Sequence, residues 1–82
     1  MAETIVIVED DESIREMLRY YFRSVGYEVG CFPSGEAYFE TGGDLDPSLF
    51  ILDIMLPGMD GLEILRRLRG DAHLSDVPVL ML

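Results

Sequence analysis

Two short apolar runs that each end in carboxylates constrain the fold of this chain more than any other feature. The first run, residues 5–8, is followed directly by Glu9 and Asp10, and the second, residues 49–52, is followed by Asp53. Apolar runs of this length are typical of strands in a parallel sheet that is covered on both faces. Ligands of such sheets bind beyond the carboxyl ends of the strands. If the two strands are neighbours, the three carboxylates converge in one small space.

Carboxylates so close together repel one another unless something positive lies among them. A hard divalent cation, which prefers oxygen ligands, would meet that requirement. The sequence contains one cysteine and one histidine, so it offers no cluster of the kind that binds zinc. The two strand ends therefore predict a site for a hard divalent cation.

Composition narrows the class of protein. A chain of 82 residues with 49% hydrophobic content suits a single small domain over residues 1–82. Acidic residues outnumber basic ones by 16 to 6, and all the basic residues are arginines, so this surface is not expected to bind nucleic acid. No signal peptide or membrane-length apolar stretch is evident, which favours the cytoplasm. Cys31 has no partner for an intrachain disulfide and is expected to be a buried structural thiol.

Hydrophobic spacing divides the chain into alternating strands and helices, an order that predicts a parallel sheet with helices on both faces. The predicted strands are residues 4–8, 27–32, 48–52 and 79–82, and the predicted helices are residues 12–25, 36–40 and the segment between Asp60 and Gly70.

Capping residues and apolar stripes define the first and third helices. Asp11 or Ser13 could cap the first helix, and Asp60 could cap the third with Glu63 as its reciprocal partner. The stripe expected on the first helix comprises Ile14, Met17, Leu18, Tyr21, Phe22 and Val25. The apolar side of the third comprises Leu62, Ile64, Leu65 and Leu68.

With these residues placed, the chain resembles the receiver domain of bacterial two-component response regulators from about Thr4 to its end. Glu9-Asp10-Asp11 after the first strand and residues 52–61 after the third carry the resemblance. The Leu-Pro-Gly-Met-Asp-Gly wording of residues 56–61 resembles the branch in which a winged-helix DNA-binding domain follows. The resemblance implies a flavodoxin-like, doubly wound α/β/α fold with strand order 2-1-3-4-5, of which this chain would supply 2-1-3-4.

The resemblance also implies residue roles. Asp53 would accept a phosphoryl group from a sensor histidine kinase, as an acyl phosphate. Glu9 and Asp10 would hold Mg²⁺ together with Asp53, with Asp10 the more direct ligand, and Met55 would contribute its backbone carbonyl. The cation would remove the repulsion between two anionic groups. Such a protein is a signalling module that acts through an output domain, here a transcriptional one, and is not a metabolic enzyme.

The family pattern continues where this sequence stops. It would go on with a Ser or Thr that contacts the phosphoryl group, a helix, a fifth strand bearing a Lys, and a last helix. The resemblance therefore predicts an incomplete receiver that lacks the fifth strand and the last two helices. Residues 79–82 would then form an open, apolar sheet edge, and such an edge recruits another strand. We expect self-association, as a dimer or by segment exchange.

Two other functions compete with the phosphoacceptor. One is an assembly module, derived from a receiver, that associates without phosphorylation. The other, ranked last, is a Mg²⁺-dependent phosphohydrolase with Asp53 as nucleophile, which would want a second Asp two residues on, where Met55 stands. His73 has no partner in sequence and is not expected to act in catalysis. Met55, Met59 and Met81 are expected to be packing residues.

Overall fold

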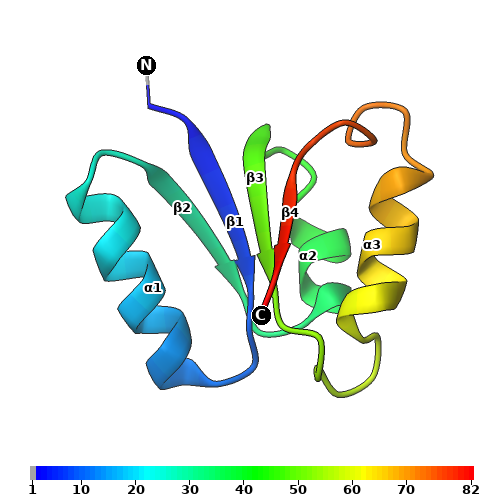
Figure 1. The fold of residues 1–82 in the computed structure, drawn as a ribbon, viewed down its shortest axis with the longest axis horizontal. Coiled ribbons are helices and arrows are strands. Elements are labelled where there is room, and N and C mark those ends of the chain that lie inside the picture. Colours follow the sequence, from blue (N-terminus) through cyan, green and yellow to red (C-terminus); the bar gives the residue numbers. More distant parts are fainter. Residues whose placement is uncertain (1) are drawn as a thin grey trace.

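A computed structural model describes residues 2–82 of the chain. Its four strands form one parallel sheet in the order β2-β1-β3-β4, which confirms the predicted order (Figure 1). The elements are β1 (Thr4–Val8), α1 (Glu12–Ser24), β2 (Glu28–Phe32), α2 (Gly35–Thr41), β3 (Pro47–Leu52), α3 (Gly61–Arg69) and β4 (Val79–Met81).

Alternation along the strands supplies two apolar faces, because successive side chains of a strand point to opposite sides of the sheet. In β1, Ile5 and Ile7 belong to the core under α1, whereas Val6 and Val8 belong to the core on the other face. Figure 1 shows α1 on one side of the sheet and α2 and α3 on the other. The continuous apolar run of β1 is thus the signature of a strand covered twice.

The core under α2 and α3 is the larger of the two. Tyr38 from α2, and Ile64 and Leu68 from α3, pack there against side chains of β1 and β3. Ile64 and Leu68 are fully buried, and burying a side chain of that size stabilises a fold by about 1.5–3 kcal/mol. This face therefore contains most of the buried side chains of the core.

The helix starts follow the predicted caps with one exception. Asp11, rather than Ser13, caps α1 by accepting a hydrogen bond from the Ile14 N–H at 3.0 Å. Asp60 caps α3 by accepting from the Glu63 N–H at 2.9 Å. The predicted reciprocal bond from Glu63 back to the cap is wrong, because the Glu63 carboxylate pairs with arginines one turn further along α3. The Glu63 oxygens are thereby engaged by the side chains of Arg66 and Arg67.

The predicted apolar stripe of α1 is only partly buried. Leu18 and Phe22 pack against the sheet, but Met17 and Tyr21 are 62% and 57% exposed. The reason is that α1 lies over β1 and β2, so its other apolar flank faces outward. Cys31 is half-buried beside this core, and burial raises the pKa of its thiol.

Some other side chains expected to pack are open. Leu62 on α3 is 60% exposed, and the Met55 side chain is 83% exposed because it lies in the loop after β3. Met59 and Met81, in contrast, do pack against the core under α2 and α3. Among residues 2–82, no helix has both the length and the apolar character needed to cross a membrane.

Candidate metal site

Strands β2, β1 and β3 end at the same height in the sheet. Glu9, which follows β1, and Asp53, which follows β3, therefore lie side by side. Val8, the last residue of β1, is paired with Phe32 of β2 on one side and with Leu52 of β3 on the other. The ladder continues one residue further: Glu9 N–H donates to the Phe32 carbonyl at 3.1 Å, and Asp53 N–H donates to the Val8 carbonyl at 3.1 Å. Parallel pairing therefore brings both carboxylates to one edge of the sheet.

The predicted convergence of three carboxylates is confirmed. One carboxylate oxygen from each of Glu9, Asp10 and Asp53 lies within 4.8 Å of the others. Glu9 is buried, Asp53 is half-buried and Asp10 is exposed, so the cluster runs from the end of the core out to solvent. Carboxylate oxygens are the type of donor that a hard cation such as Mg²⁺ prefers, and Mg²⁺ usually keeps several water ligands besides the few that a protein supplies.

Burial dominates the electrostatics of the cluster. The Glu9 side chain, only 4% exposed, has a pKa raised above its ordinary value by burial. The Asp11 N–H opposes that shift by donating to Glu9 Oε2 at 3.1 Å, while the carboxyls of Asp10 and Asp53 add to it. A buried acid beside two others is costly to ionise, and a cation among them offsets that cost.

The loop after β3 is folded back on itself, which fixes the Asp53 side chain. Asp53 Oδ1 accepts a hydrogen bond from the Met55 N–H at 3.0 Å, a local turn common for aspartate. Further along, Met59 N–H donates to Glu36 Oε2 at 3.3 Å, and Gly58 supplies the φ of +71° that a side chain would resist. The role predicted for the Met55 carbonyl stays a prediction.

Sequence reasoning missed two residues that shape this site. Arg15 on α1 donates from Nη1 to the backbone carbonyl of Glu9 at 2.8 Å. Its spacing from the Asp11 cap is the one usable signal, because residues four apart share a helix face. Gly61 lies so close to β3 that a Cβ there would be 2.6 Å from the Asp53 carbonyl oxygen. No pattern in the sequence predicts this close approach.

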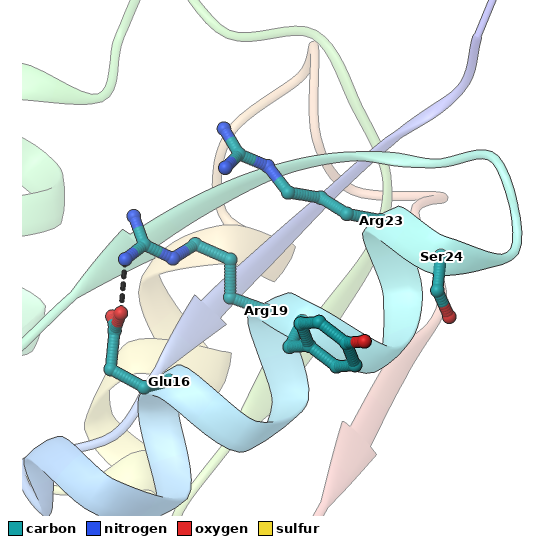
Figure 2. Close-up of a pocket in the computed structure, with 5 residues that line it drawn as sticks. Glu16, Arg19, Arg23 and Ser24 are labelled. Carbon is teal, nitrogen blue, oxygen red and sulfur yellow. Dashed lines mark hydrogen bonds and ion pairs between the residues drawn. The ribbon is translucent and has the colours of Figure 1, made fainter.

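A separate hollow of about 410 Å³ is lined by residues of α1 (Figure 2). Arg19 pairs there with Glu16, and the remaining lining residues are Tyr20, Arg23 and Ser24. None of the three clustered carboxylates lines it. His73 is also remote from the cluster: its Nε2 lies 3.9 Å from Asp46 on the exposed surface.

Comparisons with known proteins identify the family. The chain is 39% identical over its full 82 residues to the DNA-binding response regulator MtrA of Mycolicibacterium smegmatis, but it spans only 35% of that protein. Among solved structures it resembles the chemotaxis protein CheY4 of Vibrio cholerae, with a TM-score of 0.93, 26% identity, and coverage of 99% of this chain and 68% of that one. It also resembles the N-terminal domain of a response regulator receiver protein from Methanoculleus marisnigri, with a TM-score of 0.87, 37% identity, and coverage of 95% and 63%. A family model of the response regulator receiver domain matches residues 5–82. The chain therefore belongs to the response regulator receiver domain family.

Proposed function

We propose that residues 1–82 act as one receiver unit of a two-component response regulator, with Asp53 as the phosphoryl acceptor. The observation that carries the proposal is the gathering of three carboxylate oxygens within 4.8 Å at the ends of adjacent parallel strands. Membership of the receiver family supports the same assignment. As in that family generally, the module signals and does not perform metabolic catalysis.

Glu9, Asp10 and Asp53 are the residues that would hold Mg²⁺, with the Met55 backbone carbonyl as a further ligand. The donor chemistry fits, since every side-chain donor is a carboxylate oxygen, the ligand type that Mg²⁺ selects. When bound, the cation would neutralise charge on the acceptor and on the incoming phosphoryl oxygens. Glu9, buried at the end of β1, would anchor the site from the protein side.

Asp53 would act as the nucleophile. Its Oδ1 is held by the Met55 N–H, which fixes the rotation of the carboxylate, and we assign the other oxygen as the attacking atom. That oxygen forms a bond to phosphorus, the bond from phosphorus to the donor histidine nitrogen breaks, and the electron pair stays on the imidazole. The product is an acyl phosphate on Asp53. A half-buried acceptor is reachable by a donor yet partly shielded from water.

The phosphoryl donor and the output domain are assigned on the same basis. We infer that a sensor histidine kinase supplies the phosphoryl group and that an output domain, transcriptional as in the DNA-binding relative MtrA, receives the signal. The chain spans about a third of that relative, so DNA binding is assigned to the remainder of such a protein. The net charge of −10 argues against DNA binding by residues 1–82 themselves. A cytoplasmic location stays a prediction.

Phosphorylation with a small donor tests the proposal. The parent chain and the Asp53→Asn variant are incubated with acetyl phosphate and Mg²⁺, and intact mass is recorded. Asp46→Asn, a change at an exposed aspartate outside the cluster, is the matched control. We expect Mg²⁺-dependent phosphoryl uptake in the parent and in Asp46→Asn but not in Asp53→Asn. Equal uptake in all three proteins would refute Asp53 as the acceptor.

A second candidate function is assembly with a copy of the same chain. Among the described residues β4 pairs with β3 alone, and Leu80 and Leu82 are 51% and 53% exposed. An apolar sheet edge of this kind recruits another strand. Light scattering after size exclusion separates the outcomes: a dimer supports assembly, and a compact monomer contradicts it. A phosphohydrolase ranks last, because Met55 stands where a second acidic residue would be needed.

A further inference from the structure

We propose that Arg15 is a positioning residue of the acidic site. Its guanidinium holds the backbone that carries Glu9 and Asp10, and thereby keeps their carboxylates gathered for a divalent cation. The part of the inference that concerns the cation rests on the proposed function. The part that concerns the loop rests on hydrogen bonds alone.

The Arg15 side chain engages two successive carbonyls of the β1–α1 loop. Arg15 Nη1 donates to the carbonyl of Glu9 at 2.8 Å and to that of Asp10 at 3.4 Å. The backbone N–H of Arg15 donates to the carbonyl of the Asp11 cap at 3.0 Å, but this is the first hydrogen bond of α1 and does not depend on the side chain. The contact to Glu9 is the strong one, and the contact to Asp10 is near the outer limit for a hydrogen bond. The guanidinium of Arg15 thus holds the carbonyls of the two acidic residues that precede the Asp11 cap.

The other hydrogen bonds of this loop involve its N–H groups and leave the carbonyls of Glu9 and Asp10 to Arg15. Glu9 N–H is tied to β2 through the Phe32 carbonyl at 3.1 Å, and the Asp11 N–H is tied to Glu9 Oε2 at 3.1 Å. These bonds hold the N–H groups of the loop, whereas Arg15 holds its carbonyls. A guanidinium has only donors, so Arg15 satisfies the carbonyls without becoming a metal ligand. Groups that orient the ligands of a metal in this way affect its affinity.

The positive charge of Arg15 and its hydrogen bonds have opposite effects on Mg²⁺ affinity. A cation approaching Glu9 and Asp10 is repelled by the nearby guanidinium, although Arg15 is only half-buried and solvent screens the repulsion. Loss of the charge alone would therefore tighten Mg²⁺ binding, whereas loss of the loop geometry would weaken it. The opposite signs allow an experiment to tell the two effects apart.

The experiment compares Arg15→Gln and Arg15→Lys with Arg19→Gln. Arg19 lies one turn further along α1 and pairs with Glu16 (Figure 2), so its variant has the same change in charge but removes no hydrogen bond to the loop. Mg²⁺ affinity is measured by calorimetry. Solvent exchange of the Asp11 amide is measured by NMR without Mg²⁺, together with the melting temperature.

We expect Arg15→Gln to bind Mg²⁺ about 10-fold more weakly, the lower end of the range for groups that orient metal ligands, and to show faster exchange at Asp11. Arg15→Lys keeps the charge and a donor group but lacks the planar fork of the guanidinium, so it should fall between the parent and Arg15→Gln. Arg19→Gln should match the parent in both readouts. A purely structural role for Arg15 would lower the melting temperature and leave the affinity per folded molecule unchanged.

Two results would overturn the inference. One is unchanged exchange at Asp11 in Arg15→Gln, which would show that the loop does not need the guanidinium. The other is Mg²⁺ binding by Arg15→Gln that is equal to or tighter than that of the parent, which would leave only the charge effect. If the parent chain itself fails to bind Mg²⁺ while Arg15→Gln loosens the loop, the metal assignment of the proposed function fails and the positioning of the loop by Arg15 is supported.

Discussion

Replacing Gly61 with alanine should press the first turn of α3 against the strand end that carries Asp53. The added Cβ would lie 2.6 Å from the Asp53 carbonyl oxygen, 3.0 Å from Ile54 Cα and 2.9 Å from Met81 Cε. Carbon atoms pack best at about 3.5–4.0 Å. The Met81 side chain can move away, but the two main-chain atoms belong to the loop that directly follows β3, so they resist.

The size of the effect follows from two opposing contributions. A methyl group forced into tight packing costs about 1–3 kcal/mol, and contact with main-chain atoms favours the upper part of that range. The lower entropy of alanine in the unfolded chain returns about 0.4–1 kcal/mol. We expect the Gly61→Ala variant to lose about 2 kcal/mol of unfolding free energy, which lowers the melting temperature of a chain this small by about 8–16 °C.

Gly70→Ala is the matched control. Gly70 caps the other end of α3 with a φ of −83°, and its added Cβ would meet nothing closer than 3.6 Å. We expect Gly70→Ala to be unchanged or up to about 1 kcal/mol more stable. Urea titrations followed by circular dichroism measure both variants. Equal stability of Gly61→Ala and Gly70→Ala would refute the steric reasoning, and unchanged Mg²⁺ affinity in Gly61→Ala would show that Asp53 tolerates the displacement.

Three further predictions concern ionisation and the core. Burial raises the pKa of Glu9 above its ordinary 4.5, so the folded, metal-free protein holds that proton more tightly than the unfolded chain, and its stability should fall as pH rises from 4.5 through the raised pKa. Glu9→Gln should remove this fall and raise metal-free stability at neutral pH while weakening Mg²⁺ binding. Urea titrations of both proteins at several pH values measure the stability. Identical pH profiles for the two proteins would contradict the prediction. Hydrogen bonds from Arg66 and then Arg67 lower the pKa of Glu63 to about 2, so the stability that this carboxylate contributes is present above pH 4.5 and lost as pH falls toward 2. NMR titration of the Glu63 carboxyl checks it, and a midpoint near 4.5 would count against the pairing. Ile64→Ala, at a fully buried position, should lower the free energy of unfolding by about 2–5 kcal/mol. Leu62→Ala, at a position 60% exposed, should change it by no more than about 0.5 kcal/mol. Comparable losses of the two variants in urea titrations would show that the buried face of α3 is assigned wrongly.

The features that the sequence predicted correctly are those set by residues close together in the chain. The apolar runs of β1 and β3, the Asp11 and Asp60 caps, and the glycine at the end of α3 depend on residues a few positions apart, so spacing alone reveals them. Convergence of the carboxylates also followed, because neighbouring parallel strands end at the same edge of a sheet.

Spacing could not say which half of the α1 stripe would be buried, since that depends on where the helix lies over the sheet. Sequence by itself determined the order of the elements, the two faces of the sheet and the acidic residues at its edge, because these are properties of short segments. The tertiary structure alone decided that Arg15 holds the carbonyls of the acidic loop, that Glu36 reaches Met59 across 23 residues, and that Gly61 has no room for a side chain. Such contacts arise only when elements pack, because the distance between two groups is then set by every layer between them.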